Sequence, residues 1–445
     1  MRVALVGGGG AASNAANIIR RLDKDTCIDI FTDRPEIGTQ PCEIPFVLSG
    51  RLPSWDDTFV FRKKFYDERN ISVHFNTLVT RLDRSEKRLI AGTESHEYDK
   101  LILDLGAVPT IPPIPGVDGN SEYVLATNLK TARAFEEAIQ QHSTAAIVGT
   151  GQIALEVASL LKARHYERVH LLGRSDRLLR AYLDDEMAQR IEGRATDAGI
   201  DVTLSAGIQG IGSRNGRKTV ALEDRELEVD LVFFATGTEP NVALAREAGL
   251  VIGESGGIQV NEYFQTSDPD VYSIGDCTET WDAILGLKRV SQTATGAARA
   301  GRIAATNLVL GNVLPYHGTS LAFIMDAFGY QVGTVGYTEE YALGRKMDVV
   351  STVLGTATRR RSFGGKSIHV KLIADRQTEA LVGAQLISEE QVAGKIDRLA
   401  VAVAERVPFR KLALMDTCYH PITGTAYEPV IMALDELRLK FDNVI

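Results

Sequence analysis

The chain has 445 residues, of which 44% are hydrophobic and 24% charged, and a formal net charge of -9 at pH 7. This length exceeds what one hydrophobic core can hold and, at roughly 150 residues per domain, predicts about three domains. The negative charge argues against broad nucleic-acid or anionic-membrane binding, since either needs a basic face. No run of about 18 apolar residues occurs, so we expect no membrane-spanning helix.

The four cysteines, Cys27, Cys42, Cys277 and Cys418, lie far apart and form no Cys-x-x-Cys pair. Neither a disulfide framework nor a metal site is therefore indicated, and a reducing cytoplasm fits best. The apolar start at residues 3–6 runs directly into four glycines, which is typical of a strand entering a turn and not of a signal peptide.

One strand–turn–helix–strand unit occurs twice. In the first copy, residues 2–6 predict a buried strand, residues 7–10 a glycine turn, residues 14–22 a helix and residues 28–33 a second strand. The second copy has strands at 144–148 and 169–172, with a glycine turn and a helix to residue 163 between them. The first glycine of such a turn lets the chain bend, the second admits a pyrophosphate, and the third position needs a small residue, here Ala12 and Ala154. Two dinucleotide-binding units are predicted.

Three further strands end in glycine turns. Residues 101–105 and 231–235 run into Gly106 and Gly237, and we interpret both turns as crossovers between domains. Residues 271–274 end at Gly275 and Asp276, where a carboxylate can accept a hydrogen bond from a sugar or ribityl hydroxyl. The alternative for Asp276 is a helix N-cap.

The order Gly7-x-Gly9, Gly149-x-Gly151, Ala-Thr-Gly at 235–237 and Gly275-Asp276 resembles the pyridine nucleotide-disulfide oxidoreductases. Within that family the chain is most similar to the single-cysteine branch of coenzyme A disulfide reductases, NADH oxidases and NAD(P)H sulfur or persulfide reductases. The segments 41–46 around Cys42 and 418–421 support this branch. The resemblance extends over essentially the whole chain.

The resemblance implies an α/β fold of two Rossmann-like dinucleotide-binding domains, with the NAD(P) domain inserted in the FAD domain, and a C-terminal α+β dimerisation domain. The expected bounds are 1–115 and 245–312 for the FAD domain, 116–244 for the NAD(P)H domain and 313–445 for the dimerisation domain. It also implies a homodimer with bound FAD. The residues expected at FAD are Gly7, Gly9, Gly10, Ala11, Thr32, Asp33, Arg34, Val79, Gly106, Gly275, Asp276 and Ala294. Those expected at the nicotinamide nucleotide are Gly149, Gly151, Gln152, Ile153, Glu156, Gly173, Arg174, Arg177 and Gly237.

The second unit favours NADPH over NADH. NAD-selective units end their second strand with an acid that binds the ribose 2′-hydroxyl, whereas a 2′-phosphate repels that acid and attracts arginine. Here the strand ends Gly173-Arg174-Ser-Asp-Arg177, with Arg180 close behind. Arg174 and Arg177 are the expected phosphate contacts. The alternative is a solvated turn that also accepts NADH.

Cys42 is the expected redox centre. Two-cysteine relatives carry Cys-x4-Cys, but Val47 stands five residues after Cys42, so this thiol must cycle through a mixed disulfide, a persulfide or a sulfenic acid. Pro41 suits the first turn of a helix, where free amides favour a thiolate. The alternative is a buried structural cysteine. Cys27 and Cys277 are expected to pack in the core, and Cys418 either packs or lies close to the chemistry.

The resemblance also places Tyr419 and His420 of the partner subunit near Cys42, as proton or hydrogen-bond donors, with a capping or packing role for His420 as the alternative. Three departures from the family pattern stand out: Thr32-Asp33 replaces the usual glutamate for the ribose, Gln152 replaces a tyrosine gate, and Gly38 and Pro41 replace serine and asparagine near the thiol.

The expected reaction is NAD(P)H-dependent reduction of a small disulfide, persulfide or polysulfide, such as coenzyme A disulfide. Candidates for the phosphates of such a substrate are Arg21, Lys64, Arg360 and Arg361, with a solvated loop as the alternative for the arginine run. The competing hypotheses are an oxidase that reduces oxygen through a Cys42 sulfenic acid and a redox-sensing flavoprotein without catalysis.

Overall fold

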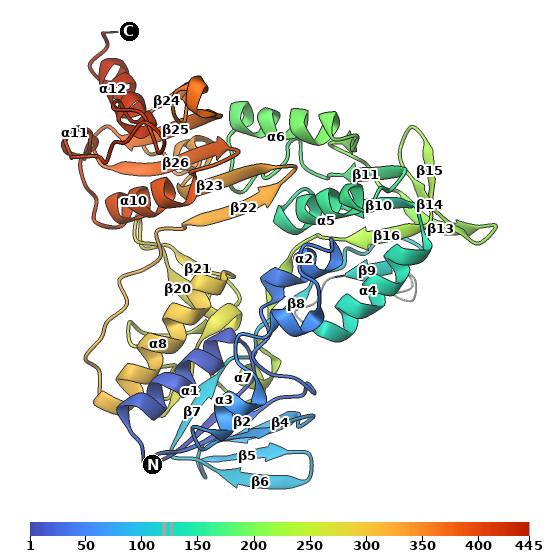
Figure 1. The fold of residues 1–445 in the computed structure, drawn as a ribbon. Coiled ribbons are helices and arrows are strands. Elements are labelled where there is room, and N and C mark those ends of the chain that lie inside the picture. The colour runs from blue at the N-terminus through green and yellow to red at the C-terminus, as the bar shows by residue number, and fades with distance from the viewer. Residues whose placement is uncertain (118–121, 125–127, 445) are drawn as a thin grey trace. The chain divides into compact units, whose positions relative to one another are not determined.

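The computed structural model describes residues 1–117, 122–124 and 128–444. The chain forms two compact units (Figure 1). Unit 1 comprises Met1–Thr110, Leu125–Arg133 and Thr238–Thr319, and unit 2 comprises Ile111–Val124, Ala134–Gly237 and Ser320–Ile445. Each unit contains one complete copy of the repeated motif.

Unit 1 is built on a five-stranded parallel sheet in the order β19-β7-β1-β2-β3. Its strands are β1 (Arg2–Val6), β2 (Cys27–Phe31), β3 (Ile71–His74), β7 (Lys100–Leu103) and β19 (Val271–Ser273). The strands are short apolar runs because helices cover a parallel sheet on its faces. Two of these helices, α1 (Gly10–Leu22) and α8 (Ala294–Leu310), pack against each other and share one core with the sheet.

Smaller elements complete unit 1. A three-stranded antiparallel sheet holds β4 (Val79–Asp83), β5 (Arg88–Ala91) and β6 (Glu94–Glu97). A mixed three-stranded sheet holds β18 (Ile258–Gln259), which pairs parallel with β20 (Thr278–Trp281), and β21 (Lys288–Val290), which pairs antiparallel with β20. The remaining elements are η1 (Pro41–Glu43), α2 (Ile44–Leu48), η2 (Trp55–Thr58), α3 (Lys63–Asp67), α7 (Ala243–Glu247) and η3 (Gly275–Cys277).

The glycine turns at Gly106 and Gly237 each lead into a short strand, β8 (Ala107–Pro109) and β17 (Thr238–Pro240), and the two strands pair antiparallel. The chain first leaves unit 1 after Thr110 and last returns to it at Thr238. The crossovers therefore lie within a few residues of both turns. The exact bounds of the three domains stay a prediction.

Unit 2 begins with the second parallel sheet, in the order β12-β11-β10-β16-β9. Its strands are β9 (Glu122–Val124), β10 (Thr144–Val148), β11 (Arg168–Leu172), β12 (Asp201–Thr203) and β16 (Leu231–Phe234). The unit also holds α5 (Gln152–Ala163), α6 (Asp185–Asp197) and a meander of β13 (Gly210–Arg214), β14 (Arg217–Ala221) and β15 (Glu226–Val229). Helix α4 (Leu129–Gln141) begins in unit 1 and continues into unit 2 from Ala134 onward.

The C-terminal part of unit 2 is a five-stranded antiparallel sheet in the order β22-β23-β26-β25-β24, with helices beside it. The strands are β22 (Phe323–Ala327), β23 (Tyr330–Gly336), β24 (Val349–Ala357), β25 (Ser367–Asp375) and β26 (Leu381–Ser388). The helical elements are α9 (Glu339–Gly344), η4 (Arg361–Phe363), α10 (Ala393–Ala404), α11 (Phe409–Ala413) and α12 (Pro429–Phe441).

The predicted fold class, two Rossmann-like sheets followed by an α+β domain, is confirmed. Within the described ranges, none of the helices combines the length and the apolar character that crossing a bilayer requires.

Candidate active site

The first glycine turn leads directly into α1. The amide of Gly7 donates to the Phe31 carbonyl over 2.8 Å, which ties the turn to the end of β2. Gly9 is the N-cap of α1 and offers no capping side chain, and no acidic residue stands in the first turn. The helix dipole favours a pyrophosphate at this end of α1, where FAD is predicted to bind.

Asp104, directly after β7, was not predicted. Its Oδ2 accepts a hydrogen bond from the Ala12 amide over 2.9 Å, and the side chain is buried. Burial raises the pKa of this carboxyl to about 7, and the nearby Asp276 adds to the shift, although the amides of Ala12 and Gly9 oppose it. The sequence carried a signal for this residue, a carboxylate two positions before Gly106 at the end of an apolar strand.

Asp276 lies inside η3, whose N-cap is Ile274, so Asp276 is not the N-cap. Its side chain is partly buried, and burial raises the pKa of the carboxyl to about 6. Within the described ranges it has no hydrogen-bond partner. A desolvated carboxyl of this kind accepts a hydrogen bond from a sugar or ribityl hydroxyl, and it therefore fits bound FAD.

After β2, Thr32 is buried and its hydroxyl accepts from the Arg34 amide over 3.3 Å, whereas Asp33 is exposed. Asp33 is therefore better placed than Thr32 to reach a ribose. The other predicted FAD residues also lie in unit 1: Val79 is buried at the start of β4, Gly106 follows β7, and Ala294 is the exposed first residue of α8.

Cys42 lies exposed in η1, immediately before α2. A bridge between Thr39 and Phe59 and a 2.8 Å hydrogen bond from the Gln40 amide to the Thr58 carbonyl close the loop that carries it. Gly38 has φ +79°, and a Cβ at this position would overlap the carbonyl of Phe61. The loop therefore leaves no room for a side chain at position 38.

Glu43 follows the thiol and was not predicted either. Its Oε2 is buried and, within the described ranges, has no hydrogen-bond partner. Burial, and then the charge of Asp57, raise the pKa of this carboxyl. The residue that follows Cys42 in the chain thus carries a carboxyl with a raised pKa.

The other cysteines differ from one another. The predicted core position of Cys27 is wrong, because Cys27 is exposed at the first residue of β2. Cys277 is buried, and burial raises the pKa of its thiol to about 11, which leaves it unreactive near neutral pH. Cys418 is exposed on the single chain, next to the exposed Tyr419 and His420 between α11 and α12.

The second glycine turn has the same construction as the first. The Gly149 amide donates to the Leu172 carbonyl over 2.9 Å, and Gly151 is the N-cap of α5. Gln152 Nε2 donates to Glu156 Oε1 over 2.8 Å, and burial raises the pKa of Glu156 to about 7. The next residue, Ile153, is exposed.

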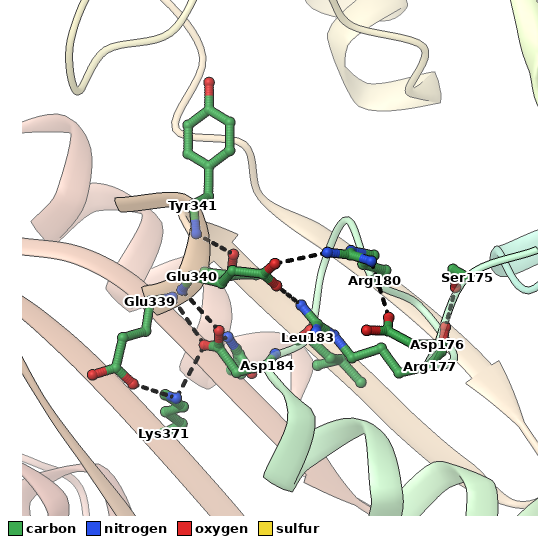
Figure 2. A network of polar contacts seen from close by, with 12 residues as sticks. Ser175, Asp176, Arg177, Arg180, Leu183, Asp184, Glu339, Glu340, Tyr341 and Lys371 are labelled. Carbon is green, nitrogen blue, oxygen red and sulfur yellow. Dashed lines mark hydrogen bonds and ion pairs between the residues drawn. The ribbon is translucent and has the colours of Figure 1, made fainter. Parts of the chain in front are cut away.

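The turn after β11 carries the predicted arginines. Arg174 is exposed, and no hydrogen bond or ion pair engages its guanidinium in the described part of the chain. Gly173, directly after β11, carries no acid of the kind that ends this strand in NAD-selective units, and a Cβ at this position would require the Thr150 side chain to shift. Arg177, in contrast, is buried: it donates to the Leu183 carbonyl over 3.1 Å and pairs with Glu340 (Figure 2).

The four predicted phosphate-binding residues are exposed but lie in different units. Arg21, near the end of α1, and Lys64, which pairs with Glu68 at 3.7 Å, belong to unit 1. Arg360 and Arg361 belong to unit 2, at η4. The neighbouring Arg359 pairs with Glu390 at 2.8 Å, so that member of the run is engaged within the chain.

Residues 1–301 match the family pyridine nucleotide-disulphide oxidoreductase, and residues 327–429 match its dimerisation domain. The chain belongs to the pyridine nucleotide-disulphide oxidoreductase family. It is 33% identical to an NADH oxidase of Methanocaldococcus jannaschii, with 100% of both chains covered. It is also 30% identical to a CoA-dependent NAD(P)H sulfur oxidoreductase of Pyrococcus furiosus, over 98% of this chain and 99% of the other.

Among solved structures, the chain is similar to an NAD-dependent persulfide reductase from A. fulgidus, with a TM-score of 0.95 and 30% identity over 100% of this chain and 84% of the other. The predicted family is thereby confirmed, as is the prediction of an NAD(P)H-dependent oxidoreductase. The family is FAD-dependent and uses NAD(P)H. The roles predicted for individual residues stay predictions.

Proposed function

We propose that this protein reduces a small disulfide, persulfide or polysulfide with electrons from NADPH, and that Cys42 is the residue that reacts with sulfur. The observation that carries the proposal is the exposed thiol of Cys42 in a loop of unit 1, the unit that also holds the first glycine turn. The relatives from Pyrococcus furiosus and A. fulgidus, named for sulfur and persulfide reduction, support it.

The proposed reaction balances without a further reductant. The Cys42 thiolate attacks one sulfur of a disulfide, forms a mixed disulfide and releases the other sulfur as a thiolate. Bound FAD would supply the two electrons, taken from NADPH, that cleave this mixed disulfide. One NADPH, one proton and one disulfide thus yield NADP⁺ and two thiols, with Cys42 restored.

Protons must reach the departing thiolates. Tyr419 and His420 of the partner subunit are the proposed donors in a homodimer. The exposed apolar residues of the same stretch support an interface there, since monomers rarely expose such a set. These residues are Leu414, Met415, Tyr419, Ile422 and Tyr427.

NADPH is the proposed reductant because glycine, not an acid, stands at position 173 directly after β11, and Arg174 is exposed beside it. Coenzyme A disulfide or a coenzyme A persulfide is the proposed substrate class, and Arg21, Lys64, Arg360 and Arg361 are candidates for its phosphates. The name of the Pyrococcus furiosus relative, which includes coenzyme A dependence, supports this class.

The experiment is a comparison of acceptors under anaerobic conditions. NADPH is supplied with coenzyme A disulfide, with inorganic polysulfide or, in a separate aerobic assay, with oxygen, and NADPH oxidation is followed. We expect rapid turnover with a sulfur acceptor and slow turnover with oxygen. Rapid oxygen turnover with inactive sulfur assays would instead favour the oxidase, which the Methanocaldococcus jannaschii relative's name supports as the second candidate. A reducible flavin with no turnover of any acceptor would favour the redox sensor.

A further inference from the structure

The segment that begins α9 is fixed against the region that follows β11, and both lie in unit 2. Thr338 is the N-cap of α9 and accepts from the Tyr341 amide over 3.1 Å. The amides of Glu339 and Glu340 donate to the Asp184 carboxylate over 2.9 and 3.1 Å. These bonds hold the first turn of α9 in place, and the side chain of Glu340 extends from it toward two arginines (Figure 2).

Glu340 has one carboxylate oxygen for each arginine. Oε2 pairs with Arg177, and Oε1 pairs with Arg180 at 2.8 Å. The hydrogen bonds from Arg177 and then Arg180 lower the pKa of Glu340, so it is charged at neutral pH. The two arginines differ in exposure: the Arg177 side chain is 10% exposed and that of Arg180 is 49% exposed.

This difference divides their roles. Arg177 also donates to the Leu183 carbonyl and has little access to solvent, so it is a structural counter-ion for Glu340. Arg180 remains open to a ligand, but Glu340 and Asp176, at 3.0 Å, already neutralise much of its charge. A second arginine of this segment is therefore partly exposed but paired with two carboxylates.

We propose that Glu340 is a nucleotide-specificity residue that competes with the 2′-phosphate of NADPH for Arg180. The inference rests on the proposed use of NADPH. A phosphate dianion bound near Arg174 would have to displace Glu340 from Arg180 or tolerate its negative charge nearby. The carboxylate thus weakens NADPH binding and leaves NADH, which lacks the phosphate, nearly unaffected. No local sequence pattern signals this role, because Glu340 lies 160 residues after Arg180.

The test is Glu340→Gln in the holoenzyme, with Glu339→Gln as the matched control, because Glu339 pairs with Lys371 and not with either arginine. The probes are adenosine 2′,5′-bisphosphate and adenosine 5′-monophosphate, titrated calorimetrically. We expect Glu340→Gln to bind the bisphosphate at least several-fold more tightly, with binding of the monophosphate unchanged. The control should match the wild type with both probes. The kcat/KM ratio of NADPH to NADH should rise by a similar factor.

The double variant Glu340→Gln with Arg180→Ala should lose the tighter binding of the bisphosphate. Glu340→Ala is the second variant, which guards against a perturbation of the turn by glutamine, and it should show the same tighter binding. Unchanged bisphosphate binding in both Glu340 variants would overturn the proposal. Weaker binding in both would also overturn it, and would indicate that the carboxylate orients Arg180 for the phosphate. The titrations involve no electron acceptor, so their outcome is independent of the proposed sulfur chemistry. Failure of NADPH as reductant would be seen separately, in the acceptor assays.

Discussion

The carboxylate of Asp104 accepts a hydrogen bond from the Ala12 amide over 2.9 Å, within the glycine turn that opens α1. The amides of such a turn ordinarily face a pyrophosphate. Burial holds the pKa of Asp104 at about 7. Ionisation near neutral pH therefore places a negative charge next to the proposed site of an anionic cofactor.

We expect FAD to bind about tenfold more weakly at about pH 8.5 than at about pH 6, because the ionised Asp104 repels the pyrophosphate. The sign follows from the raised pKa. In the folded protein the carboxyl of Asp104 keeps its proton above the ordinary value of 3.8 and loses it as the pH rises through about 7. The FAD affinity that depends on the neutral carboxyl is lost over the same pH range. Asp104→Asn should bind FAD with nearly the same affinity at both pH values. Flavin fluorescence titration of the apoprotein measures this, and an unchanged pH dependence in Asp104→Asn would assign the effect to Asp276 instead.

Lys371 is a second buried charge, and we expect it to contribute to the stability of the fold. Its side chain is 1% exposed and contacts three carboxylates: Asp184 at 3.1 Å, Glu186 at 2.5 Å and Glu339 at 2.7 Å. Burial favours the neutral amine, but the carboxylates outweigh it and raise the pKa of Lys371.

Lys371→Met should lower the free energy of unfolding by about 3 kcal/mol or more, because it leaves a buried carboxylate without its cation. Lys366→Met is the control, since Lys366 forms an exposed pair with Glu389 at 2.9 Å, and solvent screening leaves such pairs with little effect on stability. Urea titration of the holoenzyme compares the two. Equal losses in both variants would refute a special role for the buried lysine.

Cysteine alkylation tests the contrast between Cys27 and Cys277. Cys277 is buried with a pKa of about 11, whereas Cys27 is exposed. Brief treatment of the native protein with iodoacetamide near neutral pH should label Cys27 and spare Cys277, and both should react after denaturation. Peptide mass spectrometry reads the sites. Native labelling of Cys277 at the rate of Cys27 would contradict the burial of this thiol.

The sequence was sufficient to predict the two dinucleotide-binding units because their information is local. Short apolar runs ending at Gly7 and Gly149 predict buried strands, and each turn then leads into a helix. The first helix begins at Gly10, four residues before the predicted start at Asn14, because glycine and alanine give no amphipathic signal.

The charged contacts were not predictable from local patterns. Glu340 meets Arg180, and Lys371 meets Asp184, only because the fold brings segments more than 150 residues apart into contact. The prediction that Cys27 is buried was wrong because strand propensity does not indicate whether the first residue of a strand is buried or exposed. Arg177 has the sequence position of a phosphate ligand, but its guanidinium faces Leu183 and Glu340.

The central claim is that the sulfur of Cys42 passes electrons to the substrate. The most direct test is to mix the Cys42→Ser holoenzyme rapidly with NADPH and then to assay the acceptor. We expect the flavin absorbance to bleach in Cys42→Ser as in the wild type, while turnover of coenzyme A disulfide or polysulfide falls to the rate without enzyme. Disulfide turnover that survives in Cys42→Ser with normal flavin reduction would contradict the account.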